Sequence, residues 1–242
     1  MDTATPIDDL VREIRLRKDA EEIDAIADAQ RLALRAQAEV ARLVTEGARE
    51  IELCSAAASA AQDAAGKPVD VITVLASGPR TAGAAPPVLV PSKRAMGPGD
   101  AVLADLAVRH DGYWGDTTRT YACGRSDEIE EARATLSDIA RGIAESLRPG
   151  LRAREVFEHA QAAIREHFPG QDLIHHAGHG IGLEVGESPQ LVPAEDMPLQ
   201  EGMVLAIEPG LYVSGRYGVR VEDVYVVAPS GSVLVTAHDD ER

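Results

Sequence analysis

Two segments of this chain predict pairs of strands joined by tight turns. They read AVLADLAVRHDGYWGDTTRTYACG (residues 101–124) and GMVLAIEPGLYVSGRYGVRVEDVYVV (residues 202–227). Both are rich in apolar, β-branched and aromatic residues, which is typical of strands, and turn residues interrupt each run near its middle. The first turn falls near His110 and the second is centred on Gly215. These two predicted hairpins constrain the fold more than any other feature of the sequence.

Each predicted hairpin carries two acidic residues inside strands that are otherwise largely apolar. Asp105 and Asp116 belong to the first hairpin, and Glu208 and Glu222 belong to the second. The turn positions place the members of each pair roughly opposite each other, where Cβ atoms lie about 5 Å apart. Burying an ionised carboxylate without a partner costs many kcal/mol, so two such pairs predict a cation between them. Four carboxylates balance two divalent ions, which favours a two-metal centre.

The chain also offers cations of its own near these carboxylates, namely Arg119 and Arg220. Metal ions are the more economical partners, because carboxylate oxygens with one imidazole suit divalent Mn, Co, Zn or Fe. A single acidic residue is ordinarily a solvated surface group, so the prediction depends on the paired pattern. Asp223 follows Glu222 directly and is expected to face the other way, toward solvent or the outer side of the site.

Three of the seven histidines of the chain crowd into residues 175–179, in the stretch HHAGHGIGLEVGESP. His179 stands between Gly178 and Gly180, and such small neighbours allow the backbone to approach a metal ion closely. His179 is therefore the predicted imidazole ligand. His175 is expected to reach substrate or to support the ligands, whereas His176 is expected to be structural or exposed.

The rest of the chain predicts helices and one further strand. A long helix is expected to begin after Asp19, with Glu22 as its capping-box partner, and to end at Gly47. Further helices are expected at about 48–65, 126–147 and 153–167, a strand at 69–78 and a loop at 79–100. With antiparallel strand pairs between helices, the fold class is α+β.

Composition narrows the function classes. The chain has 242 residues, which suits one domain, and a formal net charge of −16, which excludes the basic footprint of a nucleic-acid binder. No run approaches the roughly 20 apolar residues of a membrane span. Neither Cys54 nor Cys123 stands in a CxxC pair, and the first ten residues lack a signal-peptide pattern. We expect a cytoplasmic protein that binds neither nucleic acid nor membrane.

Several motifs together resemble a known family. The spacing D-x10-D-x-T-R-T and the strings GHGIGLE, ESP, GMVLAIEPGLY and GVRVED are similar to those of the pita-bread metallohydrolases. That family includes Xaa-Pro dipeptidases (prolidases), aminopeptidase P, methionine aminopeptidases and creatinase. The resemblance covers about residues 10–235 and is closest to the prolidase and aminopeptidase P branch. It implies a pita-bread fold, with two pseudo-symmetric α+β halves whose antiparallel strands are covered by helices.

The resemblance also implies roles for individual residues. Its metal ligands map onto the residues chosen above for their burial and charge, which are Asp105, Asp116, His179, Glu208 and Glu222. It implies two divalent ions (Mn, Co, Zn or Fe, with Mn favoured) and a hydroxide that attacks the scissile carbonyl. Glu208 is the implied catalytic proton carrier to the leaving nitrogen. His175 is implied to be catalytic and to bind substrate, and Arg220 to bind substrate. Thr118 and Arg119 are implied to support the ligands.

The chain departs from the family pattern at its substrate side. Gly186 stands where the family has a histidine seven residues after the ligand histidine, and Val88 and Leu89 stand where another substrate histidine is usual. These changes predict an altered substrate pocket. The chain also reads as a single catalytic domain over 1–242, with a lead-in at 1–18 and no separate N-terminal domain. A homodimer is an open alternative to a monomer.

Three functions remain open from the sequence. The first is a dinuclear metal-dependent hydrolase of a C–N bond in a small peptide, similar to Xaa-Pro dipeptidases. The second is a specialised hydrolase of one small non-peptide amide. The third is a non-catalytic pita-bread binding module. Such modules typically lose metal ligands, and the presence of all five ligand residues disfavours this function. Metal-free hydrolysis of the creatinase type is disfavoured for the same reason.

Overall fold

The computed structural model describes residues 7–83 and 89–237. Its helices are α1 (Ile7–Leu16), α2 (Ala20–Leu43), α3 (Glu50–Ala65), α4 (Asp127–Ser146) and α5 (Ala153–His167), with a short 3-10 helix, η1 (Gly78–Ala82). Within these described ranges, no helix combines the length and the apolar character that crossing a membrane requires.

The long helix α2 follows its sequence pattern closely at one end. Asp19 accepts a hydrogen bond from the backbone N–H of Glu22, and the Glu22 carboxylate accepts one from the backbone N–H of Asp19, so the predicted capping box is present. The helix ends at Leu43 rather than at Gly47. Before α2, residues 7–16 form α1, where the sequence predicted only a lead-in.

The first sheet contains β1 (Asp70–Ser77), β2 (Ala101–His110) and β3 (Tyr113–Ala122), antiparallel and in that order. In the β2–β3 hairpin Asp105 faces Thr118 and Asp116 faces Ala107, so the two aspartates are diagonal neighbours on one face rather than directly opposite. The difference arises because the two-residue turn is Asp111–Gly112, one position later than expected. Since the offset is two residues, both carboxylates still face the same side.

The second half contains the remaining strands. They are β4 (Gly178–Gly180), β5 (Glu187–Gln190), β6 (Val204–Ile207), β7 (Gly210–Val213), β8 (Tyr217–Arg220), β9 (Asp223–Ala228) and β10 (Gly231–Leu234). Five of them form an antiparallel sheet in the order β10-β9-β6-β4-β5, and β7 pairs with β8. Ile207 of β6 pairs with Asp223 of β9, and Gly210 of β7 pairs with Arg220 of β8. The two strand pairs have the same register, so Glu208 and Glu222, which lie between them, face each other as predicted.

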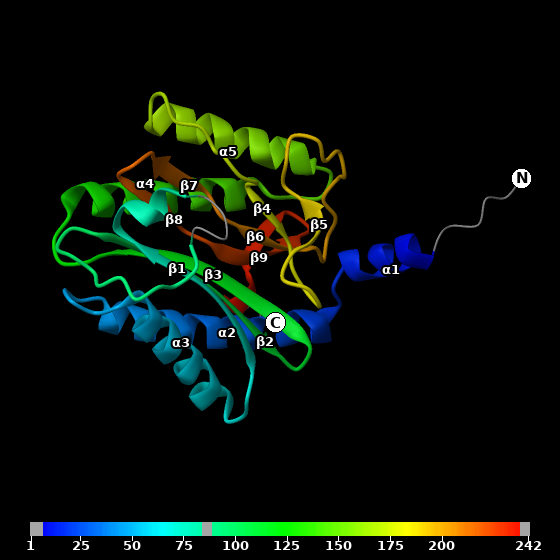
Figure 1. The fold of residues 1–242 in the computed structure, drawn as a ribbon. Helices are drawn as coiled ribbons and strands as arrows, with labels where there is room; N and C mark the ends of the chain where they lie inside the picture. The colour runs from blue at the N-terminus through cyan, green and yellow to red at the C-terminus, as the bar shows by residue number, and fades with distance from the viewer. Residues whose placement is uncertain (1–6, 84–88, 238–242) are drawn as a thin grey trace, which may run out of the picture.

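Helices form the outer layers and strands lie between them (Figure 1). On one side α2 and α3 pack against the first sheet through Ala33, Val40 and Leu53, which meet Val102 and Leu106 of β2. On the other side α4 and α5 pack against the second half in a separate core cluster. In β2 the even-numbered residues face α2 and α3, so the odd-numbered Asp105 faces the second half of the molecule. The carboxylates therefore converge between the two halves.

Candidate functional site

Acidic side chains from both halves meet around one imidazole. The Nε2 atom of His179 lies 3.9 Å from an Asp116 carboxylate oxygen, 3.4 Å from one of Glu208 and 3.9 Å from one of Glu222. Donor atoms of Asp116, His179 and Glu222 all lie within 4.8 Å of one another. These four side chains are buried, with at most 9% of each side chain exposed. The structure thus brings together four of the five predicted ligands.

Hydrogen bonds from neighbouring elements hold the two most deeply placed carboxylates. Gln30 of α2 exchanges two hydrogen bonds with the backbone of Asp116, at 2.9 and 2.8 Å, and so fixes this position of β3. The hydroxyl of Thr118 donates to a Glu222 carboxylate oxygen at 2.7 Å. The backbone N–H of Glu222 in turn donates to the carbonyl of Thr118 at 3.0 Å. Helix α2 and strand β3 therefore orient ligands of both halves.

His179 is presented by the short strand β4, which lies between β6 and β5. Its Nδ1 atom lies 3.0 Å from the carbonyl of Gly180, so Nδ1 donates to this carbonyl and Nε2 faces the carboxylates. The structure explains the two glycines that flank His179 by the packing of neighbouring strands rather than by close approach to a metal ion. A Cβ on Gly178 would meet the carbonyl oxygen of Ala206 at 2.0 Å, and one on Gly180 would meet that of Ser188 at 2.3 Å. Glycine here lets neighbouring strands approach.

Asp105, the fifth predicted ligand, has a protein cation as its partner in this structure. A carboxylate oxygen of Asp105 forms a short ion pair with the guanidinium of Arg220. Arg220 also lies 3.9 Å from Glu208 through its Nε atom. Arg119, the other cation considered from the sequence, instead donates to the backbone carbonyl of Glu222 and to the carboxylate of Asp223, both at 2.6 Å. Only Arg220 of these two arginines therefore faces the carboxylate cluster.

A chain of polar groups runs from Arg220 to His175. Arg220 donates to the hydroxyl of Tyr212 at 3.4 Å, and this hydroxyl lies 2.9 Å from Nε2 of His175. The Nδ1 atom of His175 lies 2.6 Å from the carbonyl of His176, so Nδ1 donates and Nε2 accepts from Tyr212. Burial lowers the pKa of His175 to about 4, which keeps the ring neutral. Tyr212 is the last residue of the string GMVLAIEPGLY, but the contact of its hydroxyl with His175 was not predicted.

His176 lies at the site, although the sequence analysis expected it to be structural or exposed. Its Nδ1 atom is 3.1 Å from a carboxylate oxygen of Glu208, and its ring meets that of His179 edge-on with centroids 5.6 Å apart. No periodic pattern covers residues 171–177, which form no regular element. Nothing in the sequence therefore indicated which way this ring points.

The electrostatics of the cluster call for added positive charge. Burial raises the pKa of Asp116 well above its ordinary 3.8, and the nearby carboxylates of Asp105 and Glu208 raise it further. Burial and the charge of Asp116 likewise raise the pKa of Glu222. Burial alone would raise the pKa of Glu208, but the neighbouring His176 and the charge of Arg220 outweigh it and bring it to about 2. The protein's own cations thus outweigh the effect of burial at Glu208 but not at Asp116 or Glu222.

The residues present fit divalent metal ions. The Oδ1 atom of Asp116 is buried and, within residues 7–83 and 89–237, has no hydrogen-bond partner. A buried carboxylate oxygen without a donor is costly unless a cation meets it. Carboxylates joined by an imidazole whose other nitrogen is held by a carbonyl are a donor set that Mn, Co, Zn and Fe accept. The site would hold such ions through Asp116, His179, Glu208 and Glu222.

These groups open into a cavity of about 390 Å³. Its walls include Ile72, Val74 and Val185 beside the polar residues described above, and Gly186 and Gln190 also line it. A Cβ on Gly186 would meet nothing closer than 3.9 Å, so the missing side chain leaves open space.

The other substituted family position lies elsewhere in the described structure. Leu89 is fully buried and packs with Ala76, Leu103 and Tyr212, outside the cavity lining. Val88 lies outside the described residues.

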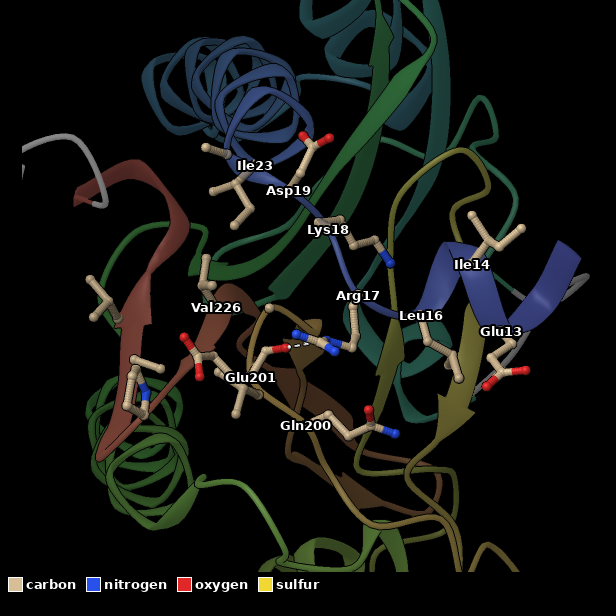
Figure 2. A pocket seen from close by; sticks show the side chains of 16 residues that line it. Glu13, Ile14, Leu16, Arg17, Lys18, Asp19, Ile23, Gln200, Glu201 and Val226 are labelled. Atoms are coloured by element: carbon tan, nitrogen blue, oxygen red, sulfur yellow. Dashed lines mark hydrogen bonds between the residues drawn. The ribbon is translucent and has the colours of Figure 1, made fainter. Parts of the chain in front are cut away.

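A second and larger cavity, of about 770 Å³, is unrelated to this chemistry. It lies where the junction of α1 and α2 meets residues 200–202 and β9, and Arg17 donates to the carbonyl of Glu201 across it (Figure 2). It shares no lining residue with the carboxylate cavity. Among the described residues, two groups of three side chains could hold a metal ion, Asp116–His179–Glu222 and His175–His176–Glu208, and neither group belongs to its walls. Chemistry rather than size therefore selects the smaller cavity as the candidate site.

Comparison with known proteins decides the family. The profile of metallopeptidase family M24 matches residues 24–229. This chain belongs to metallopeptidase family M24. It is 34% identical over 237 residues to the Xaa-Pro dipeptidase of Pyrococcus furiosus, covering 97% of this chain and 67% of that protein. It is also 34% identical over 229 residues to the probable dipeptidase PepE of Mycobacterium tuberculosis, covering 94% of this chain and 60% of that protein.

Solved structures of M24 proteins confirm the predicted fold. The prolidase from Pyrococcus furiosus superposes with a TM-score of 0.89 at 32% identity, over 96% of this chain and 68% of that one. The X-Pro aminopeptidase from Thermotoga maritima gives 0.86 at 30% identity, over 95% and 64% of the two chains. The α+β pita-bread architecture expected from the sequence is thus confirmed. The M24 chain described here spans about 60–68% of the length of these relatives.

Proposed function

We propose that this M24 protein hydrolyses the C–N bond of small peptides, as a dipeptidase of the Xaa-Pro type with an altered substrate pocket. Asp105, Asp116, His179, Glu208 and Glu222 would hold two divalent ions, with manganese favoured. The single observation that carries the proposal is the buried cluster of Asp116, His179 and Glu222, with donor atoms within 4.8 Å of one another at the floor of a cavity. The names of the relatives supply the substrate class.

The bound ions would polarise the scissile carbonyl and lower the pKa of a water molecule. Glu208 would accept the proton from this water and deliver it to the leaving nitrogen, because its carboxylate lines the cavity beside the other proposed ligands. Asp105 lines the same cavity and would exchange its contact with Arg220 for a metal ion. His175, held neutral by burial and by Tyr212, and Arg220 would then bind and orient the substrate.

The open space beside Gly186 supports a substrate group larger than the ordinary dipeptide at that point. A small non-peptide amide is therefore the second candidate substrate class. We also propose that the protein works in the cytoplasm, in keeping with its free Cys54 and Cys123, and as one catalytic domain over 1–242 with a lead-in at 1–18. A homodimer remains a prediction.

A substrate panel tests the proposed function. Purified protein is loaded separately with Mn, Co and Zn and assayed on Xaa-Pro dipeptides, on other dipeptides and on small non-peptide amides. Hydrolysis of Xaa-Pro dipeptides supports the first candidate, and turnover confined to the amides supports the second. If none of the three metals gives turnover on any member of the panel, the proposal of a hydrolase is wrong.

The substitution Glu208→Gln tests the assigned proton carrier. We expect kcat on the best substrate to fall by at least about 100-fold, because an amide cannot accept the proton from water. The circular dichroism spectrum should stay unchanged. Glu201→Gln is the matched control, since Glu201 is exposed and does not line the carboxylate cavity. Full activity of Glu208→Gln would contradict the assigned role.

A further inference from the structure

Of the three crowded histidines, His176 alone has no role in the function proposed above. The rings of the other two are committed on both sides. His175 contacts a backbone carbonyl and the hydroxyl of Tyr212, and His179 contacts the carbonyl of Gly180 and the carboxylates. His176 lines the same cavity, yet neither a core cluster nor a strand explains its position.

The contact of His176 is with the predicted proton carrier. Its Nδ1 atom lies 3.1 Å from an Oε atom of Glu208, which is hydrogen-bonding distance. This nitrogen is buried and, in the part of the chain that the structure describes, no partner meets both the distance and the angle of a hydrogen bond. A buried polar atom without a partner is costly, and the Glu208 carboxylate is the acceptor that a small rotation of the ring would reach.

We propose that His176 is a positioning residue that holds the Glu208 carboxylate through an Nδ1–H hydrogen bond. The inference rests on the proposed function for its consequence in catalysis, but the contact itself concerns a predicted metal ligand. Groups that hydrogen-bond to metal ligands orient these ligands, and the loss of such a group typically weakens metal binding or activity by about 10–100-fold. His176 thus holds the Glu208 oxygen that also lies 3.4 Å from Nε2 of His179, in the cavity that both histidines line.

Substitution of His176 by asparagine or by glutamine distinguishes a hydrogen-bonding role from a role in filling space. The side-chain amide of asparagine can place an N–H near the position of Nδ1, whereas that of glutamine reaches toward the position of Nε2. His176→Asn should therefore keep the contact with Glu208, while His176→Gln and His176→Leu should lose it. His167→Leu is the matched control, because His167 is an exposed histidine at the end of α5.

The experiment measures Mn²⁺ affinity by isothermal titration calorimetry on the full chain, and then kcat and KM on the best panel substrate. We expect His176→Leu and His176→Gln to bind Mn²⁺ about 10–100-fold more weakly and to lower kcat more than they raise KM. His176→Asn and His167→Leu should stay within about 3-fold of the unchanged protein. Circular dichroism verifies the fold of each variant.

Two results would overturn the inference. One is unchanged Mn²⁺ affinity and kcat in both His176→Leu and His176→Gln. The other is a loss in His176→Asn as large as that in His176→Leu, which would show that the amide donor is irrelevant. If the panel shows no hydrolysis while Mn²⁺ binding still follows the expected order, the proposed function fails and the positioning role of His176 stands.

Discussion

Among single residues, different surroundings give three buried carboxylates of the cluster different pKa values. Glu208 has His176 and Arg220 beside it and keeps a pKa of about 2. Asp116 and Glu222 face mainly other carboxylates and have a raised pKa. Glu208, the proposed proton acceptor, therefore differs from Asp116 and Glu222 in its neighbours rather than in its own chemistry.

Gly178 shows how a residue without a side chain supports the site. Its φ is +153°, and a Cβ added to it would lie 2.0 Å from the carbonyl oxygen of Ala206, which leaves no room for alanine. We expect Gly178→Ala to lower the free energy of unfolding by about 2–4 kcal/mol, because backbone strain adds to the steric clash. Urea-induced unfolding followed by circular dichroism measures this loss.

Gly142→Ala provides the control for that measurement. Gly142 lies on the exposed side of α4 and a Cβ there meets nothing within 4 Å. Alanine should therefore raise the free energy of unfolding by about 0.5–1 kcal/mol, as expected in a helix. Equal effects of the two substitutions would contradict the account of the strand contact.

Site residues could be predicted where a charged side chain stood in an apolar strand, and could not be predicted where no such feature marked them. Acidic residues in apolar strands are costly, so the convergence of Asp116, Glu208 and Glu222 could be expected from the sequence alone. His176 follows His175 in an irregular segment, where no periodicity fixes the direction of a side chain. Arg220 was considered as a cation near the carboxylates, but its pairing with Asp105 was not predicted, because the two residues lie far apart along the chain.

Between elements, buried ion pairs connect the N-terminal helices to the strand beside the cavity. Glu187 of β5 accepts from Arg15 of α1 at 2.5 Å and from Lys18, between α1 and α2, at 3.1 Å. The side chains of Lys18 and Glu187 are only 2% and 6% exposed. Since Glu187 adjoins Gly186, this connection also fixes one wall of the cavity.

The substitution Glu187→Gln tests this connection. We expect the free energy of unfolding at pH 7 to fall by about 3 kcal/mol, because Lys18 keeps a buried charge without its partner. Despite burial, which acts to raise it, Lys18 and Arg15 hold the pKa of Glu187 below its ordinary 4.5. The contribution of Glu187 is thus present above pH 4.5 and is lost as the pH falls through the lowered pKa.

Chemical denaturation between pH 3 and pH 7 measures this dependence. The difference between the unchanged protein and Glu187→Gln should shrink steadily below pH 4.5. Glu184→Gln is the control, because Glu184 binds Arg15 with a side chain that is 66% exposed and should cost at most about 1 kcal/mol. A difference that does not depend on pH would contradict the ion-pair explanation.

Element-level prediction depended on periodicity and turn chemistry. The helices near 19–47 and 153–167 and both hairpins were expected because their patterns are long. The turn at Asp111–Gly112 shifted the first register by two residues, which preserved the face of each aspartate. Strands β4, β5 and β10 span only three or four residues and were not predicted, whereas the equally short β6, β7 and β8 belong to the longer strand-like run at residues 202–227.

In the complete fold, the carboxylates converge where the two halves meet, beside an apolar cluster in which Ile23 and Ile26 of α2 pack with Val204 and Val224 of the second half. The chain carries a formal net charge of −16, so the cluster adds repulsion to a fold that is already acidic. One hairpin of each half delivers two carboxylates, and β4 delivers the imidazole. Divalent ions bound at Asp116, His179 and Glu222 would therefore contact side chains of both halves.

The metal content of the purified protein is the decisive quantity for a carboxylate cluster of this kind. The protein is loaded with Mn²⁺, freed of unbound metal and analysed by inductively coupled plasma mass spectrometry, beside Asp116→Asn and the Glu201→Gln control. Two ions per chain are expected for the unchanged protein and the control, and at most one for Asp116→Asn, which loses a ligand charge. Absence of bound metal in the unchanged protein, or two ions retained in Asp116→Asn, would contradict the proposed two-metal centre.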